Sequence, residues 1–248
     1  MEIDSGPVRA AIRQQLMADR LLGIKSVPMK TPPRKRRKGG SAATKAEKAE
    51  KLRELDETWV KGCRECKLCE TRTQTVFGQG DPAARIVFVG EAPGSEEDKQ
   101  GLAFVGRAGQ LLTRMIIAMG LSREDVFICN VLKCRPPQNR DPSADEILSC
   151  NPYLSEQLAI IQPQVLVALG APAAKTLLGT AQSIGKLRGH FHEYCVTGDD
   201  GGEVVIPVMP TYHPAYLLRN PAEKRKVWED LQTVMKRLGL PAPQGKPA

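Results

Sequence analysis

The sequence contains no long apolar segment. Across its 248 residues, no uninterrupted apolar run approaches the roughly 20 residues that a membrane-spanning helix needs. Residues 1–15 include acidic and polar side chains where a secretory signal peptide would carry its apolar region. These absences exclude a membrane protein and predict a soluble, cytoplasmic protein without a membrane partner, with a monomer as the default expectation.

The composition also lacks the biases of fibrous or wholly disordered chains. Hydrophobic residues make up 41% of the sequence and charged residues 26%. This supply of apolar side chains is enough for one domain of ordinary size plus an appendage. A collagen-like or fully disordered protein is therefore excluded.

The net charge of +8 is unevenly distributed. The first 60 residues contain 14 basic and 8 acidic residues, so most of the excess lies there. A basic run at residues 34–38 follows two prolines and precedes a stretch with little to bury. We predict an N-terminal arm over residues 1–50, formed by a short helix and a disordered basic linker over residues 25–50. The run is either a solvated segment or a phosphate-binding arm without sequence specificity.

From residue 51 on, short β-branched runs alternate with helical periodicity. This alternation predicts an α/β domain over residues 51–240, with a central four-stranded parallel-type sheet flanked by helices. We expect a disordered tail over residues 241–248. The expected strands are 85–91, 126–133, 165–170 and an edge pair of 190–196 with 204–212; the expected helices are 108–120, 143–161, 171–179 and 221–238.

Three loops carry candidate chemistry, and all follow predicted strands. Glu91 opens a Gly/Pro-rich loop whose next residues include three adjacent acids, which suits a water or a developing positive charge better than a phosphate. Asn130 ends a strand, where its amide offers one donor and one acceptor to a planar ligand, or simply caps the strand. His213 lies between a strand and a helix. Because ligands bind beyond the carboxyl ends of parallel strands, we expect these loops to converge.

The spacing of the cysteines predicts a metal or cluster site. A C-x2-C-x2-C run at residues 63–69 is followed by two cysteines 16 positions apart. Zinc and an iron–sulfur cluster both accept four thiolates, and the single clear C-x2-C knuckle favours iron–sulfur. Cys69 is an alternative ligand to either of the first two cysteines, or a spectator. The expected ligands are Cys63, Cys66, Cys134 and Cys150, and the expected core thiols are Cys129 and Cys195.

Five motifs in order resemble one family. They are GEAPG followed by EED, G-x-x-FVGxAGQLL, the strand-end asparagine before VLKCRPPQNR, HPAYLLRNP, and the four-cysteine set. Together they resemble the uracil-DNA glycosylase superfamily, and most of all its fourth, iron–sulfur family of bacteria and archaea, over about residues 60–240. The resemblance implies a [4Fe-4S] cluster on the same four cysteines and a DNA repair enzyme that hydrolyses the bond between uracil and deoxyribose in DNA.

The resemblance also implies roles at the base. Phe104 would stack on the flipped uracil, and Asn130 would read its N3–H and O4. Glu97 would exclude the methyl group of thymine, and the backbone amides of Ala92 and Gly94 would add ligand contacts. His213 would donate to O2, while Glu91 would orient the attacking water and stabilise the cationic sugar.

Further residues are expected to contact uracil-containing DNA. The segment at residues 217–219 resembles the wedge that fills the gap left by a flipped nucleotide. The loop that begins at a cluster ligand would contact phosphates. Alternatives from other classes are an iron–sulfur electron-transfer or redox-sensing protein and a nonenzymatic zinc-ribbon DNA-binding module. The expected DNA contacts are Arg135, Gln138, Asn139, Arg140, Leu217, Leu218 and Arg219.

Overall fold

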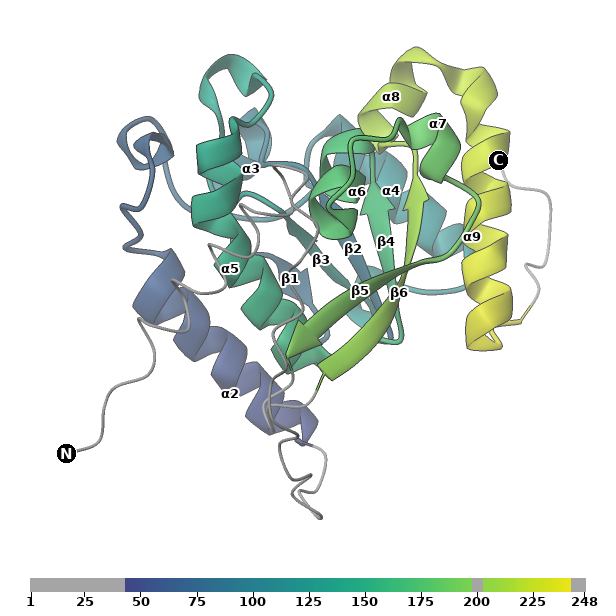
Figure 1. Ribbon diagram of the computed structural model, residues 1–248, viewed down its shortest axis with the longest axis horizontal. Coiled ribbons are helices and arrows are strands. Elements are labelled where there is room, and N and C mark those ends of the chain that lie inside the picture. The colour runs from purple at the N-terminus through teal and green to yellow at the C-terminus, as the bar shows by residue number, and fades with distance from the viewer. Residues whose placement is uncertain (1–42, 198–202, 242–248) are drawn as a thin grey trace, which may run out of the picture.

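The computed structural model describes residues 43–197 and 203–241 (Figure 1). The predictions for residues 1–42 and for the tail from residue 242 therefore lie outside the described residues. Among those that are described, no helix combines the length and apolar character needed to cross a membrane.

The fold is an α/β domain built on one mixed sheet. The sheet runs in the order β1-β3-β2-β4-β6-β5, and its four central strands β3, β2, β4 and β6 are parallel. This confirms the four parallel strands predicted, but the described sheet has six strands because antiparallel β1 and β5 add its two edges. The strands are β1 (Gln79–Gly80), β2 (Ile86–Gly90), β3 (Phe127–Asn130), β4 (Val165–Leu169), β5 (His192–Thr197) and β6 (Glu203–Thr211).

Helices cover both faces of this sheet. Figure 1 shows α2 beside α5 at one side of the molecule and α9 at the other. The four helices predicted over residues 108–238 are present, and each end lies within three residues of its predicted position. The described helices are α2 (Lys45–Leu55), η1 (Asp56–Val60), η2 (Lys67–Glu70), α3 (Ser95–Gln100), α4 (Arg107–Ala118), η3 (Arg123–Asp125), η4 (Pro137–Asn139), α5 (Ala144–Ile161), α6 (Ala171–Leu178), α7 (Ile184–Leu187), α8 (Pro214–Arg219), η5 (Pro221–Glu223) and α9 (Lys224–Leu238).

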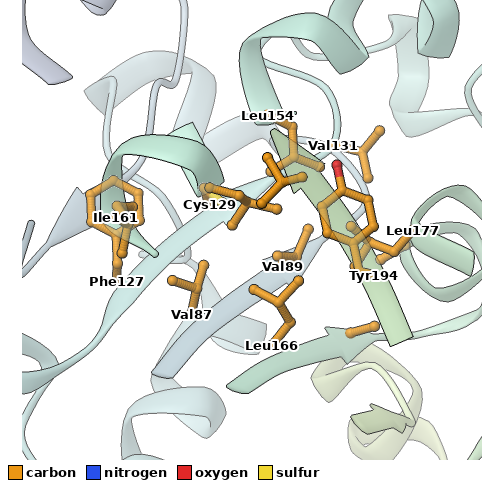
Figure 2. Packing of buried hydrophobic residues seen from close by; sticks show 14 of the residues in the cluster. Val87, Val89, Phe127, Cys129, Val131, Leu154, Ile161, Leu166, Leu177 and Tyr194 are labelled. Atoms are coloured by element: carbon orange, nitrogen blue, oxygen red, sulfur yellow. The ribbon is translucent and has the colours of Figure 1, made fainter. Parts of the chain in front are cut away.

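The central strands are buried on both faces, so alternate side chains enter two separate cores. Val87 and Val89 of β2 join the core beneath α2, α5 and α6, part of which is drawn in Figure 2. Ile86 and Phe88 of the same strand join the core beneath α4, α8 and α9. This two-sided burial explains why these strands read as continuous apolar runs.

The expected linker ends earlier than predicted. Thr44 and Glu47 form a capping box that starts α2 at Lys45, so residues 45–50 are helical. Leu52 and Leu55 are buried, and the Nζ atom of Lys48 donates to the carbonyl of Ile161 on α5 across 2.8 Å. These contacts attach α2 to the domain.

Candidate active site

The three predicted loops meet at one cavity beyond the carboxyl ends of the central strands. The cavity has a volume of about 230 Å³, and every predicted base-contacting or catalytic residue lines it. Sequence reasoning missed four neutral lining residues, because Pro and Ala side chains carry no chemical signature. The lining consists of Glu91, Ala92, Pro93, Gly94, Glu97, Phe104, Ala108, Asn130, Pro136, Asn139, Arg140, His213 and Ala215.

Asn130 lines this cavity and carries an unused acceptor. Its side chain is 1% exposed, and its Oδ1 atom is buried without a hydrogen-bond partner. Leaving such an atom unpaired costs about 1–3 kcal/mol. A strand-end cap would use this oxygen, so its state fits a ligand-binding role better than the capping alternative.

The neighbouring strand leaves room for Asn130. Gly90 pairs with Asn130 in the β2–β3 register. A Cβ atom on Gly90 would lie 2.3 Å from Oδ1 of Asn130 and 2.5 Å from the ring of Phe104. Glycine at this position therefore allows the amide and the aromatic ring to occupy the same end of the sheet.

Phe104 forms one wall of the cavity in an unusual backbone conformation. Its φ of 53° lies in the left-handed region, and its side chain is 6% exposed. Strain of this kind costs about 1–3 kcal/mol and is concentrated at functional sites. The ring centroids of Phe104 and His213 are 5.7 Å apart, with 34° between the ring planes. The two rings thus border the same space from different elements.

Glu97 supports the segment that follows Phe104. Its Oε1 atom accepts from the backbone N–H groups of Val105 and Gly106, at 2.8 and 2.9 Å. A Cβ atom on Gly94 would lie 2.8 Å from Oε2 of Glu97, so glycine there makes room for the carboxylate. Glu97 is therefore a fixed part of the cavity wall.

His213 is oriented by the start of α8. Its Nδ1 atom accepts from the backbone N–H of Ala215 across 3.1 Å and so caps the helix. Burial, reinforced by the positive charge of Arg219, lowers the pKa of His213 to about 4. The ring is therefore neutral at neutral pH, with its proton on Nε2 and available for donation.

The carboxyl group of Glu91 has a pKa close to neutral pH. It follows β2 directly, and its backbone carbonyl accepts from Leu132 across 3.0 Å. Burial, with the negative charge of Asp141 adding to it, raises the pKa of Glu91 to about 7. Raised values of this kind mark groups that exchange protons or stabilise positive charge.

The loop after β3 has an exposed tip with one internal side-chain hydrogen bond. Gln138 and Asn139 both have a φ of 54°, and Oδ1 of Asn139 accepts from Nε of Arg135 across 2.8 Å. Arg140 is exposed but makes a bidentate contact with the buried Glu146, at 2.6 and 2.9 Å. Arg140 therefore has a structural partner, which the prediction of a phosphate contact did not include.

The predicted wedge on α8 is only partly available. Leu218 is 36% exposed and Arg219 is exposed, whereas Leu217 is 1% exposed and packs in the core beneath α4, α8 and α9. The short helix turns Leu217 inward, so its burial does not support the predicted DNA contact, which stays a prediction. Leu218 and Arg219 are the side chains that can reach a ligand outside the protein.

The four predicted cysteine ligands line a single second cavity. Cys63 and Cys66 come from the segment before η2, Cys134 from the loop after β3, and Cys150 from α5. Cys69 does not line this cavity. Cys129 is buried as predicted, whereas Cys195 is exposed on edge strand β5, contrary to prediction, because its strand has one outward face.

Hydrogen-bond donors surround these sulfur atoms. Arg72 Nη1 donates to Sγ of Cys134 across 3.0 Å, and the backbone N–H of Lys133 donates to Sγ of Cys150 across 3.1 Å. The hydroxyl of Tyr153 lies 3.2 Å from Sγ of Cys63. Such donors stabilise thiolate, so the donor set fits a thiolate-ligated group.

The described residues contain no preformed site for a single metal ion. Within residues 43–197 and 203–241, no three His, Cys, Asp or Glu side chains are grouped closely enough to hold one metal ion. A tetrahedral zinc site requires Zn–S distances of about 2.3 Å and so brings its four sulfurs together. Four thiols from three separate segments that line one cavity suit a cluster with several metal atoms.

Comparison with known proteins gives consistent similarities. Residues 77–232 match the family described as the uracil DNA glycosylase superfamily. The chain is 49% identical over 176 residues to the type-4 uracil-DNA glycosylase of Thermotoga maritima, which covers 70% of this chain and 88% of that protein. It is 47% identical over 184 residues to the type-4 enzyme of Saccharolobus solfataricus, covering 72% and 83%. It is 42% identical over 188 residues to the type-4 enzyme of Archaeoglobus fulgidus, covering 74% and 92%.

Proposed function

The chain belongs to the uracil-DNA glycosylase superfamily, and we propose that it hydrolyses the N-glycosidic bond of uracil in DNA as a monofunctional, base-flipping repair enzyme. The electron-transfer and zinc-ribbon alternatives give no role to the cavity beyond the carboxyl ends of the central strands. The glycosylase assignment gives a role to all three loops that meet at this cavity.

One observation carries the proposal, namely the buried and unpartnered Oδ1 of Asn130 at the cavity. Uracil presents a donor at N3 and an acceptor at O4, which match the oxygen and nitrogen of an amide. Cytosine has the opposite polarity at both positions, so its binding would leave the amide unpaired in a buried site. Asn130 therefore selects uracil over cytosine.

The walls of the cavity bind the rest of the base. Phe104 offers a ring for stacking, which contributes about 1–3 kcal/mol per base without distinguishing between bases. Glu97, fixed by two backbone N–H groups, occupies the wall that excludes a methyl group at C5. The amides of Ala92 and Gly94 supply further contacts to the ligand. Stacking thus gives affinity, while the amide and the wall give selectivity.

His213 and Glu91 act on the breaking bond. The neutral His213 donates its Nε2–H to uracil O2, where negative charge grows as the base leaves. The carboxylate of Glu91 orients the attacking water and stabilises positive charge on the sugar. The two groups thus stabilise the opposite charges that develop on the base and on the sugar.

Contacts at the edge of the cavity and outside it hold the opened duplex. Leu218 and Arg219 project from α8 and fill the gap left by the flipped nucleotide. The loop that carries Arg135, Gln138 and Asn139 contacts phosphates, and Asn139 also lines the cavity. Arg140 can add a phosphate contact only while keeping its pairing with Glu146.

Cys63, Cys66, Cys134 and Cys150 hold a [4Fe-4S] cluster. When bound, the cluster would supply a structural crosslink, and the hydrolysis needs no redox step from it. It joins the segment around η2 to α5 and to the loop of residues 134–140. Arg72 reinforces this join, since it donates to Sγ of Cys134 and to the carbonyl of Cys63.

The proposal is tested by incubating the purified protein with single- and double-stranded oligonucleotides that contain one uracil, followed by alkali. Strand scission at uracil is expected in both. Matched oligonucleotides with thymine or cytosine at the same position serve as controls and should stay intact. Absence of scission at uracil would reject the enzymatic assignment.

A further inference from the structure

The guanidinium group of Arg123 donates hydrogen bonds to the backbone that carries Phe104. It lies at the start of η3, between α4 and β3, and belongs to none of the loops that line the cavity. Its Nη2 atom donates to the carbonyl of Ala103 across 2.8 Å, and its Nη1 atom donates to the carbonyl of Phe104 across 3.2 Å. Nη1 also lies 3.1 Å from Oγ1 of Thr113 on α4. One guanidinium therefore ties two consecutive carbonyls to the helix that follows them.

The hydrogen bonds of Arg123 hold a strained turn at Phe104. Phe104 adopts a φ of 53°, which a bulky side chain takes up only when its surroundings impose it. Gly109 leaves space for the turn, because a Cβ atom there would lie 1.8 Å from the carbonyl oxygen of Phe104. Glu97 holds the N–H groups of the next two residues. The turn is thus fixed through its carbonyls by Arg123 and through its N–H groups by Glu97.

Arginine is well suited to this task, and its own position is fixed. The guanidinium is a planar fork with five donors, whereas lysine is a single point charge. Ser122 and Asp125 form a capping box around η3, with the Ser122 N–H donating to Oδ2 of Asp125 across 2.7 Å. The fork is therefore presented from a short, capped element rather than from a free loop.

We propose that Arg123 is a positioning residue for uracil binding, which sets the ring of Phe104 in the orientation that stacks on the flipped base. The inference rests on the proposed function, since it takes Phe104 as the stacking surface. Arg123 itself does not line the cavity. Its effect on the base is therefore transmitted through Phe104.

A double-mutant cycle tests this inference. Arg123→Ala is expected to lower kcat/KM for uracil excision about 10- to 100-fold, as a small misplacement of a binding group does, and to weaken inhibition by free uracil. The kcat/KM of Arg123→Lys should lie between those of the wild type and Arg123→Ala, because the lysine can still reach one of the two carbonyls. Arg114→Ala, which removes an exposed arginine of α4, is the matched control and should change kcat/KM little.

The decisive comparison is made in the Phe104→Ala background. There Arg123→Ala should add almost nothing, because residues that act through one another are not additive. The inference would be overturned if Arg123→Ala lowered kcat/KM as much in the Phe104→Ala background as in the wild type. It would also be overturned if Phe104→Ala itself had no effect. If Arg123→Ala fails to fold, Arg123→Lys completes the same cycle. Wild-type excision of uracil measured in parallel separates a failure of this inference from a failure of the proposed function.

Discussion

The backbone N–H of Ala215 donates to Nδ1 of His213 across 3.1 Å, which places the proton of the neutral ring on Nε2. The low pKa of His213, about 4, keeps this tautomer uncharged at neutral pH. The cavity therefore receives a neutral hydrogen-bond donor at a defined position. Such a donor stabilises negative charge without having to lose a proton itself.

The first prediction concerns His213→Ala. Removing one preorganised donor to a developing negative charge commonly lowers kcat by about 100- to 1,000-fold. Because the ground-state base makes little use of that donor, affinity for uracil-containing DNA should change little. Single-turnover excision and equilibrium DNA binding measure the two effects. A loss of affinity as large as the loss of rate would show that His213 acts in binding rather than in bond cleavage.

The second prediction is a pH dependence set by Glu91. Its pKa is raised to about 7 mainly by burial, and the proposed role needs the carboxylate. kcat/KM should therefore rise as pH increases through about 7 and level off above it. Glu91→Gln should be slow, and its pH profile should lack this step. The same step in Glu91→Gln would assign the titration to another group.

Folding stability gives an independent check on Glu91. A carboxyl group whose pKa is raised on folding contributes stability below its unfolded pKa, near 4.5, and loses it as pH rises through about 7. Glu91→Gln should therefore be stabilised relative to the wild type at about pH 8 and not at about pH 4. Denaturant unfolding at the two pH values measures this difference.

The third prediction separates the two leucines of α8. Leu217→Ala empties a buried site and should lower the free energy of unfolding by about 2–5 kcal/mol. Leu218→Ala removes a partly exposed side chain and should change stability by less than about 0.5 kcal/mol. Leu218→Ala should slow excision from duplex DNA roughly tenfold while sparing single strands, which need no gap to be filled. Equal slowing on both substrates would contradict the wedge role.

The fourth prediction concerns the cysteines. Purified protein should be brown, with a broad absorbance at about 400 nm. Cys150→Ser should lose most of this absorbance, whereas Cys69→Ser should keep it, because Cys69 does not line the shared cavity. A colourless protein that is prepared anaerobically and contains stoichiometric zinc would overturn the cluster assignment.

The sequence predicted the parallel core and the residues around the cavity because these are locally encoded. Val87 and its neighbours form a continuous apolar run of strand length, and the site residues follow directly after such runs. Asn130 and His213 were therefore found from position and residue type. β1 was missed because two residues are too short to show a periodic pattern.

Other features depend on contacts between distant residues. The choice between Leu217 and Leu218 is set by how the six-residue helix α8 packs on α4, which no local pattern encodes. The link from Arg123 to Phe104 spans 19 positions and involves backbone carbonyls, which carry no sequence signal. The start of α2 could have been found, because Thr44 and Glu47 have the spacing of a capping box.

The central claim is that the amide of Asn130 reads the base, and Asn130→Asp tests it most directly. A buried protonated acid can pair with N3 and N4 of cytosine. The ratio of uracil to cytosine excision rates, measured with excess enzyme on matched oligonucleotides, should fall because uracil release slows and cytosine release appears. An unchanged ratio, with uracil still released at the wild-type rate, would contradict the account.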